Sequence, residues 1–149
     1  MMTRFSSRLM ALTLPALLPL AAMADDASAL RISDPVIYAT PPMAKAAGGY
    51  MLVENTGETD DTLVNVTSED VPMVQLHRSM NVDGVMKMEH QDAIHIPAGE
   101  SVVFKRGDYH VMFIKLDSPM TEGDDITVTL EFENAGAVPV TFTVIPRPE

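Results

Sequence analysis

Short stretches in which apolar and polar residues alternate recur along this chain, and no stretch shows a convincing helical period. Within residues 62–67, for example, Val64 and Val66 fall on one face and Leu63, Asn65 and Thr67 on the opposite face, as in a half-buried strand. Segments rich in Pro, Gly and Asn separate these stretches and mark turns. We therefore expect about eight or nine short strands, at residues 32–38, 49–54, 62–67, 71–79, 93–96, 101–105, 109–116, 126–133 and 138–145.

Many short strands without helices predict an all-β fold, specifically an antiparallel β-sandwich of one domain. The sequence contains no internal repeat, linker or low-complexity segment that would divide it further. Pro35 interrupts the first predicted strand. Because proline has no N–H to donate to a ladder, we expect that strand at an edge of its sheet.

The strongest local signal is Val82-Asp83-Gly84-Val85, because Asp-Gly between apolar residues is a preferred two-residue hairpin turn with positive φ at both turn positions. The two valines then face each other across the hairpin. The register that follows places His77 opposite His90. It also places Ser79 opposite Met88, so that the side chains of His77 and Met88 share a face as diagonal neighbours.

The first 24 residues have the features of a secretory signal peptide. Arg4 and Arg8 supply a positive flank, residues 9–21 an apolar run, and residues 22–24 a small-residue cleavage pattern with the cut expected after Ala24. The apolar run is too short to span a bilayer comfortably, and no later stretch is long and uncharged enough to do so. We therefore expect an exported, soluble domain at residues 25–149 with no membrane span.

The predicted mature chain is strongly acidic. Removal of residues 1–24 takes away two arginines and no acidic residue, so the formal net charge falls from −11 to −13. Nucleic acid and anionic lipid need a basic face, and neither is an expected partner. The charge suits a cation or a basic partner, although acidic residues also simply keep exported domains soluble.

Cysteine is absent from the sequence, so an exported domain of this kind must hold its core without disulfides. Its absence also excludes thiol redox chemistry, zinc sites built on thiolates and blue-copper electron transfer. The sequence shows no nucleophile motif and no carboxylate pair that stands out from the acidic surface. We therefore do not expect an enzyme.

Two histidines and two methionines form a candidate metal site: His77, Met88, His110 and Met112. On a strand, His110 and Met112 point to one face while their neighbours point to the other. Thioethers are soft, neutral ligands that select Cu(I). They also cannot form disulfides in an oxidising compartment, and an acceptor with thiolates would bind Cu(I) more tightly and draw the ion away.

The spacing His-x10-Met-x21-His-x-Met, set in the segments DGVMKM and GDYHVMFIKL, resembles the periplasmic copper chaperones of the PCuAC family over most of the mature chain. The resemblance implies a cupredoxin-like, antiparallel Greek-key β-sandwich that binds Cu(I) through the residues His77, Met88, His110 and Met112. It further implies a periplasmic protein that delivers copper to cytochrome c oxidase assembly, with an oxidase subunit or a Sco-type thiol protein as the acceptor. We expect a monomer. Some members carry Met where this chain has Arg78, and some carry a His- and Met-rich tail, so a tail-borne second copper is not expected here.

Several alternatives stay open. His90 is a rival ligand because it lies opposite His77 in the predicted hairpin, and Met80 or Met86 could assist the site. His95 is expected at the surface, because its two isoleucine neighbours point the opposite way. Three further methionines are expected to fill the core: Met51, Met73 and Met120. The same sequence also fits a periplasmic copper-buffering protein or a metal-free structural sandwich.

Overall fold

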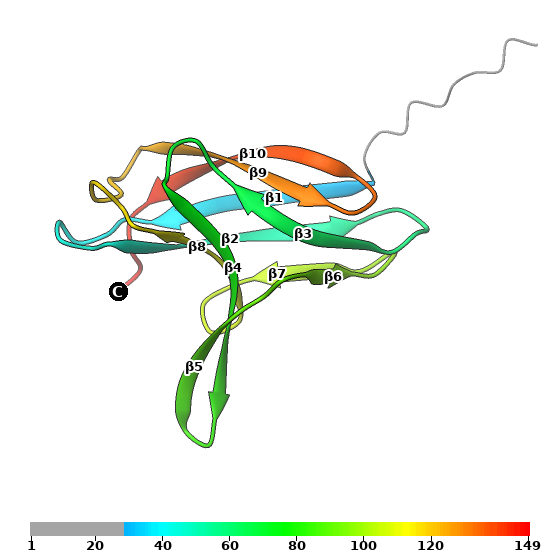
Figure 1. Ribbon diagram of the computed structural model, residues 1–149, viewed down its shortest axis with the longest axis horizontal. Coiled ribbons are helices and arrows are strands. Elements are labelled where there is room, and N and C mark those ends of the chain that lie inside the picture. Colours follow the sequence, from blue (N-terminus) through cyan, green and yellow to red (C-terminus); the bar gives the residue numbers. More distant parts are fainter. Residues whose placement is uncertain (1–28) are drawn as a thin grey trace, which may run out of the picture.

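The computed structural model describes residues 29–149, which form ten strands and no helix (Figure 1). The strands are β1 (Leu30–Tyr38), β2 (Ala46–Asn55), β3 (Asp61–Thr67), β4 (Met73–Val82), β5 (Val85–His90), β6 (Ile94–Ile96), β7 (Ser101–Phe104), β8 (Tyr109–Ile114), β9 (Asp125–Phe132) and β10 (Gly136–Ile145). The predicted signal peptide, residues 1–24, lies outside the described residues. Within residues 29–149, no helix is long and apolar enough to cross a membrane.

The strands form one continuous ladder in the order β5-β4-β8-β2-β1-β10-β9-β3-β6, and β7 also pairs with β2. The pairs are antiparallel except for β1 with β10, which is parallel. Because the ladder folds back on itself, strands from its two halves enclose the core. Phe113 of β8 and Phe142 of β10 meet there edge to face, with ring centroids 6.0 Å apart. The predicted all-β, mostly antiparallel fold is confirmed, with ten strands in place of the eight or nine expected.

The alternating pattern places most apolar side chains as expected. Met51 and Met120 are buried in the core, whereas Met73 is only partly buried. His95 is exposed between two buried isoleucines. The largest fully buried side chains come from β1, β2, β3, β6, β8, β9 and β10: Phe113, Phe142, Ile37, Leu63, Ile94, Ile96, Leu130, Val53, Val111, Val128 and Val144.

The expectation that the first strand lies at an edge is wrong. β1 lies between β2 and β10 in the ladder. Pro35 is accommodated by a bulge, because the register with β2 shifts between Ser33 and Val36 and Asp34 adopts a positive φ of 50°. Bulged residues leave the ladder, so the N–H that proline lacks is not needed there.

The expectation that Val64 and Val66 share a face is also wrong. In β3 the register with β9 shifts between Leu63 and Asn65. This irregularity interrupts the alternation, so Val64 is exposed while Leu63 and Val66 are buried. An inserted residue of this kind reverses the faces of the residues that follow it, which a pattern of period two cannot reveal.

The Asp-Gly hairpin has the predicted geometry. Asp83 and Gly84 have φ values of 54° and 81°, and the side-chain oxygen of Asn81 accepts a hydrogen bond from the N–H of Gly84 at 2.9 Å. The register of β4 with β5 is the predicted one, and His77 lies opposite His90. Figure 1 shows this hairpin protruding from the body of the molecule, so β5 is paired on one side only.

Gly49 of β2 lies where two aromatic rings of the core meet. A Cβ atom there would lie 2.7 Å from Cε2 of Phe113 and 3.3 Å from Cε1 of Phe142. We expect Gly49→Ala to lower the free energy of unfolding by about 1–3 kcal/mol, because both rings are buried and have little room to move. Urea denaturation measures this change. Gly48→Ala is the control, because its Cβ would meet the end of the Tyr50 side chain, which can rotate; equal stability of Gly49→Ala and the parent would contradict the described packing.

Candidate metal centre

The predicted ligands come from three neighbouring strands, β5, β4 and β8. The pairing of β4 with β8 places His77 directly opposite His110 and Gln75 directly opposite Met112. On the other side of β4, the register places Met88 diagonal to His77. Because directly opposite residues share a face and side chains alternate along a strand, all four predicted ligands lie on one face of this part of the sheet.

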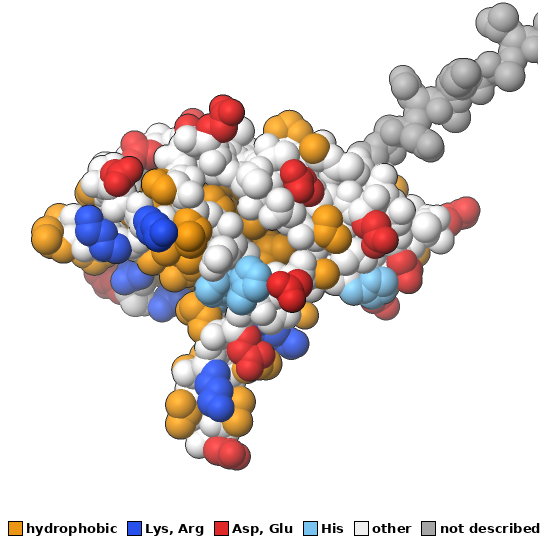
Figure 2. All heavy atoms as spheres, viewed as in Figure 1, with side chains coloured by type: hydrophobic (Ala, Val, Ile, Leu, Met, Phe, Trp, Pro, Cys, Tyr) orange, Lys and Arg blue, Asp and Glu red, His pale blue; other side chains and the backbone are white. Residues whose placement is uncertain are grey.

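This face lies outside the core. The alternate residues of β4 and β8, such as Leu76, Val111 and Phe113, point to the opposite side and are buried. Figure 2 shows histidine side chains gathered at the base of the protruding hairpin. The core therefore sets the position of the strands, and the candidate ligands lie on the other face of the same strands, where His110 is itself buried.

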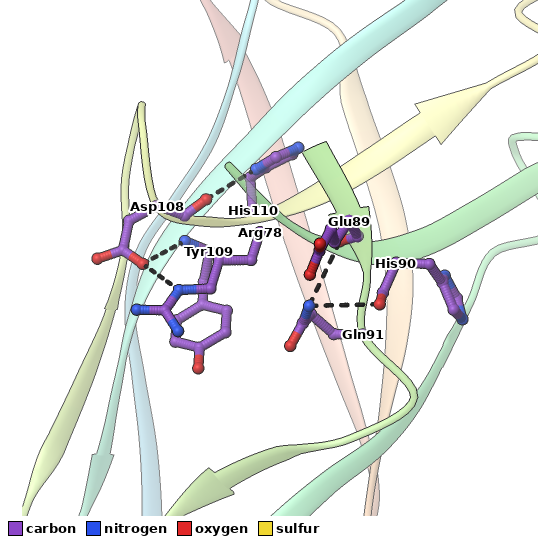
Figure 3. Close-up of polar contacts among 7 residues, drawn as sticks. All are labelled: Arg78, Glu89, His90, Gln91, Asp108, Tyr109 and His110. Carbon is purple, nitrogen blue, oxygen red and sulfur yellow. Dashed lines mark hydrogen bonds and ion pairs between the residues drawn. The ribbon is translucent and has the colours of Figure 1, made fainter. Parts of the chain in front are cut away.

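The imidazoles of His77 and His110 are neighbours, with ring centroids 5.8 Å apart. Nε2 of His77 donates a hydrogen bond to Oε1 of Gln75 at 3.0 Å. Nδ1 of His110 donates to the carbonyl oxygen of Asp108 at 3.0 Å (Figure 3). Since each of these nitrogens carries the ring proton, the other nitrogen of each neutral ring presents a lone pair.

Those two lone-pair nitrogens, Nδ1 of His77 and Nε2 of His110, are the buried side-chain atoms that have no hydrogen-bond partner among the described residues. Other buried polar side chains are engaged. Asn55 donates to the carbonyls of Thr59 and Ile96 and accepts from a backbone N–H, and Asp61 accepts three backbone N–H groups. Buried polar groups are nearly always paired, so two adjacent unpaired nitrogens call for a partner such as a metal ion.

The electrostatics of the site favour neutral imidazole. Burial lowers the pKa of His77, and the neighbouring imidazoles of His110 and His90 lower it further. The neutral form is the one that binds metals, because the protonated ring has no free lone pair. His77 is therefore ready to act as a ligand at a lower pH than an isolated histidine.

Methionine sulfur is the other donor on this face. Met112 is partly buried, whereas Met88 is 53% exposed on the outer arm of the hairpin. Met86 is exposed on the same face, and Met80 lies on the opposite face because it is an odd number of residues from His77. Among residues 29–149, no three His, Cys, Asp or Glu side chains gather as a metal site would require. The thioethers of Met112 and Met88 are the further candidate donors on this face.

Aromatic side chains from the neighbouring strands cover the inner end of the site. The ring of Tyr50 lies 6.5 Å from that of His110 and 5.2 Å from that of Tyr38, measured between centroids. Gly48 makes this possible, since a Cβ there would lie 2.7 Å from the hydroxyl oxygen of Tyr50. Burial raises the pKa of Tyr50, although Arg106 opposes the shift. The phenol therefore stays neutral and acts as a cover, not as an anionic ligand.

Asp108 fixes the start of β8 (Figure 3). Its Oδ1 accepts hydrogen bonds from Nε of Arg78 at 3.2 Å and from the N–H of Tyr109 at 3.0 Å. The guanidinium of Arg78 also lies 4.8 Å from the centroid of the Tyr109 ring, a cation–π contact. Since the carbonyl of the same aspartate holds His110, Arg78 supports the site from the opposite face of the sheet.

Sequence reasoning missed three of these residues. Gln75 and Asp108 each precede a predicted histidine ligand by two residues, and two-residue spacing on a strand indicates a shared face, so that signal was present. Tyr50 belongs to a strand far away in the sequence, and no local pattern connects it with His110. The fourfold ligand set itself stays a prediction, since the structure brings the two imidazoles together but leaves Met88 exposed.

The family profile described as "Putative lipoprotein LpqE-like" matches residues 30–144. One curated relative is "Putative lipoprotein Lxx21020" of Leifsonia xyli, 34% identical over 106 residues, or 67% of this chain and 64% of the relative. Another is "Uncharacterized protein RP573" of Rickettsia prowazekii, 29% identical over 86 residues, or 57% of this chain and 48% of the relative. The matches thus span between about half and two thirds of these relatives' length.

Similar solved structures include the copper-bound PCuAC domain from PmoF2, with a TM-score of 0.66 and 28% identity over 80% of this chain and 94% of that domain. The solution structure of CuI-DR1885 from Deinococcus radiodurans has a TM-score of 0.65 and 25% identity over 92% of this chain and 97% of that one. These likenesses confirm the cupredoxin-like fold and the resemblance to PCuAC proteins. The chain belongs to the LpqE-like family and shares the fold of PCuAC domains.

Proposed function

We propose that this protein is a carrier of Cu(I), which it binds through His77, Met88, His110 and Met112 and passes to another protein. The observation that carries the proposal is the pair of buried imidazole nitrogens without partners, on a face lined by thioethers. Two similar structures are described as copper-bound and CuI-bound, which supports the choice of metal. Soft sulfur ligands beside neutral imidazoles favour Cu(I) over harder ions.

The proposed ligands suit transfer better than permanent storage. Imidazole and thioether are both neutral, so they leave the positive charge of Cu(I) uncompensated. A thiolate on an acceptor compensates that charge and binds the ion more tightly, which makes release favourable. Met88 is the most exposed of the four ligands, so a ligand of the acceptor can approach copper from the side of the hairpin. Transfer of this kind is ligand exchange without a chemical reaction on a substrate, so the carrier is not an enzyme.

We further propose that the carrier works as a monomer in the periplasm. The signal-like segment at residues 1–24, with its cut after Ala24, supports export, as does the family's description as lipoproteins. A site without thiolates keeps its ligands in a compartment where cysteines form disulfides. The proposed destination is cytochrome c oxidase assembly, with an oxidase subunit or a Sco-type thiol protein as the acceptor.

Removal of a ligand should weaken Cu(I) binding. We expect one Cu(I) per chain in the parent protein and an affinity reduced about tenfold or more in Met88→Leu and in His110→Ala, because changes even beyond the direct ligands have effects of this size. Anaerobic competition with the Cu(I) chelator bicinchoninate measures the affinity. Met43→Leu is the control, because Met43 is 85% exposed and lies on none of the three strands of the site. If Met88→Leu and His110→Ala both bound Cu(I) as tightly as the parent protein, the assignment of these residues as ligands would be wrong.

The hydrogen bond from His77 to Gln75 should also matter. In Gln75→Leu the proton of His77 is no longer held on Nε2, so both tautomers should become populated and Cu(I) affinity should fall by about tenfold. Nitrogen-15 NMR of the imidazole reports the tautomer, and chelator competition reports the affinity. Gln91→Leu is a matched control, because the Gln91 side chain donates its hydrogen bonds to the backbone carbonyls of Glu89 and His90 and not to an imidazole. An unchanged tautomer in Gln75→Leu would contradict this role.

Delivery and buffering predict different effects of deleting the gene. If the protein delivers copper to an oxidase, the deletion strain should lose cytochrome c oxidase activity when copper is scarce, and added copper should restore it. Oxidase activity in membranes and growth in excess copper are the measurements. Normal oxidase activity at low copper, together with sensitivity to excess copper, would contradict delivery and support buffering.

A further inference from the structure

Three imidazoles form one row across β8, β4 and β5. His77 is directly opposite His110 on one side and directly opposite His90 on the other. The ring centroids are 5.8 Å apart in the first pair and 5.7 Å apart in the second. Two imidazoles bound to one metal through bonds of about 2.0–2.1 Å have ring centres roughly 5–6 Å apart. His77 therefore belongs to two pairs, and each pair has a spacing that suits a shared metal ion.

Exposure increases along this row. His110 is 3% exposed, His77 is partly buried, and the side chain of His90 is 52% exposed. His90 also lines a surface hollow of about 320 Å³ between β3 and β4, together with Gln75 and Asp92. The inner pair is thus covered by protein, whereas the outer pair is open to an approaching molecule.

The outer imidazole has a carboxylate beside it. Nε2 of His90 lies 3.3 Å from Oδ1 of Asp92, a contact that leaves Nδ1 for a metal. A carboxylate that holds one nitrogen of a ligating imidazole is a common support in metal sites. The three imidazoles do not form a preformed three-nitrogen site, because no such group of donors gathers in the described part of the chain. His90 and His110 lie on opposite sides of β4, so the two pairs hold the ion one after the other.

We propose that His90 is the port of the copper site, the ligand through which Cu(I) enters and leaves. The inference rests on the proposed function. An incoming ion binds first between His90 and His77. A bond from copper to Nε2 of His110 then forms as the bond to His90 breaks, while His77 stays bound throughout. Each step is ligand exchange, so copper remains Cu(I) and no electron is transferred. Release follows the reverse order.

A port ligand differs from an equilibrium ligand in a measurable way. Because a port lowers the barrier between the bound and free states, its loss slows entry and exit together and leaves their ratio, the affinity, nearly unchanged. His95 is the matched control, since it is also an exposed histidine, with Nε2 3.4 Å from Oδ2 of Asp60, but lies on β6, away from the row. A general effect of losing a surface imidazole would appear in a variant of His95 as well as in a variant of His90.

The test compares His90→Asn, His95→Asn and the parent protein, each loaded with one Cu(I). Stopped-flow transfer of the ion to excess bicinchoninate should be about tenfold slower in His90→Asn, or about 1.4 kcal/mol in the barrier, with Cu(I) affinity within about threefold of the parent. His95→Asn should match the parent in both. Two results would overturn the role of His90 as the port. One is transfer of Cu(I) from His90→Asn at the same rate as from the parent, and the other is a loss of Cu(I) affinity as large as in Met88→Leu. Absence of Cu(I) binding in the parent would overturn the proposed function itself.

Discussion

The pairing of β4 with β8 places His77 directly opposite His110, and the rest of the site depends on this register. A shift of one residue in either strand would turn its imidazole toward the core and bring Leu76 or Val111 to the surface. The register is fixed because these apolar side chains are almost completely buried on the inner face. The hydrophobic core therefore positions the proposed metal ligands without contributing one.

The site retains a local instability that the fold tolerates. A buried polar atom without a partner costs about 1–3 kcal/mol, and the site contains two of them, one on each imidazole. The remaining nitrogens are held by Gln75 and by the carbonyl of Asp108, so the unpaired nitrogens are fixed in direction and protonation. Departures from good packing and pairing of this kind are expected at functional sites. They lie on the surface that we propose as the metal site.

Much of the fold and part of the site could be predicted from the sequence, because some of the signals are local. The Asp-Gly turn fixed the hairpin register, and with it the position of His90 opposite His77. The contact of His77 with His110 depends instead on pairing between strands far apart in the sequence, and only the resemblance to a known family indicated it. Bulges caused the two errors in the fold, since the inserted residues at Pro35 and in β3 leave no trace in a pattern of period two.

The site has a covered inner half and an open outer half. His110 and Met112 sit on a strand of the body, whereas Met88 and His90 sit on the protruding hairpin, exposed to a partner. In the proposed site, imidazoles and thioethers from both halves hold one Cu(I) ion. X-ray absorption spectroscopy of the Cu(I)-loaded protein tests that claim most directly. We predict about two nitrogen and two sulfur neighbours around copper; a spectrum with nitrogen or oxygen neighbours and no sulfur would contradict it.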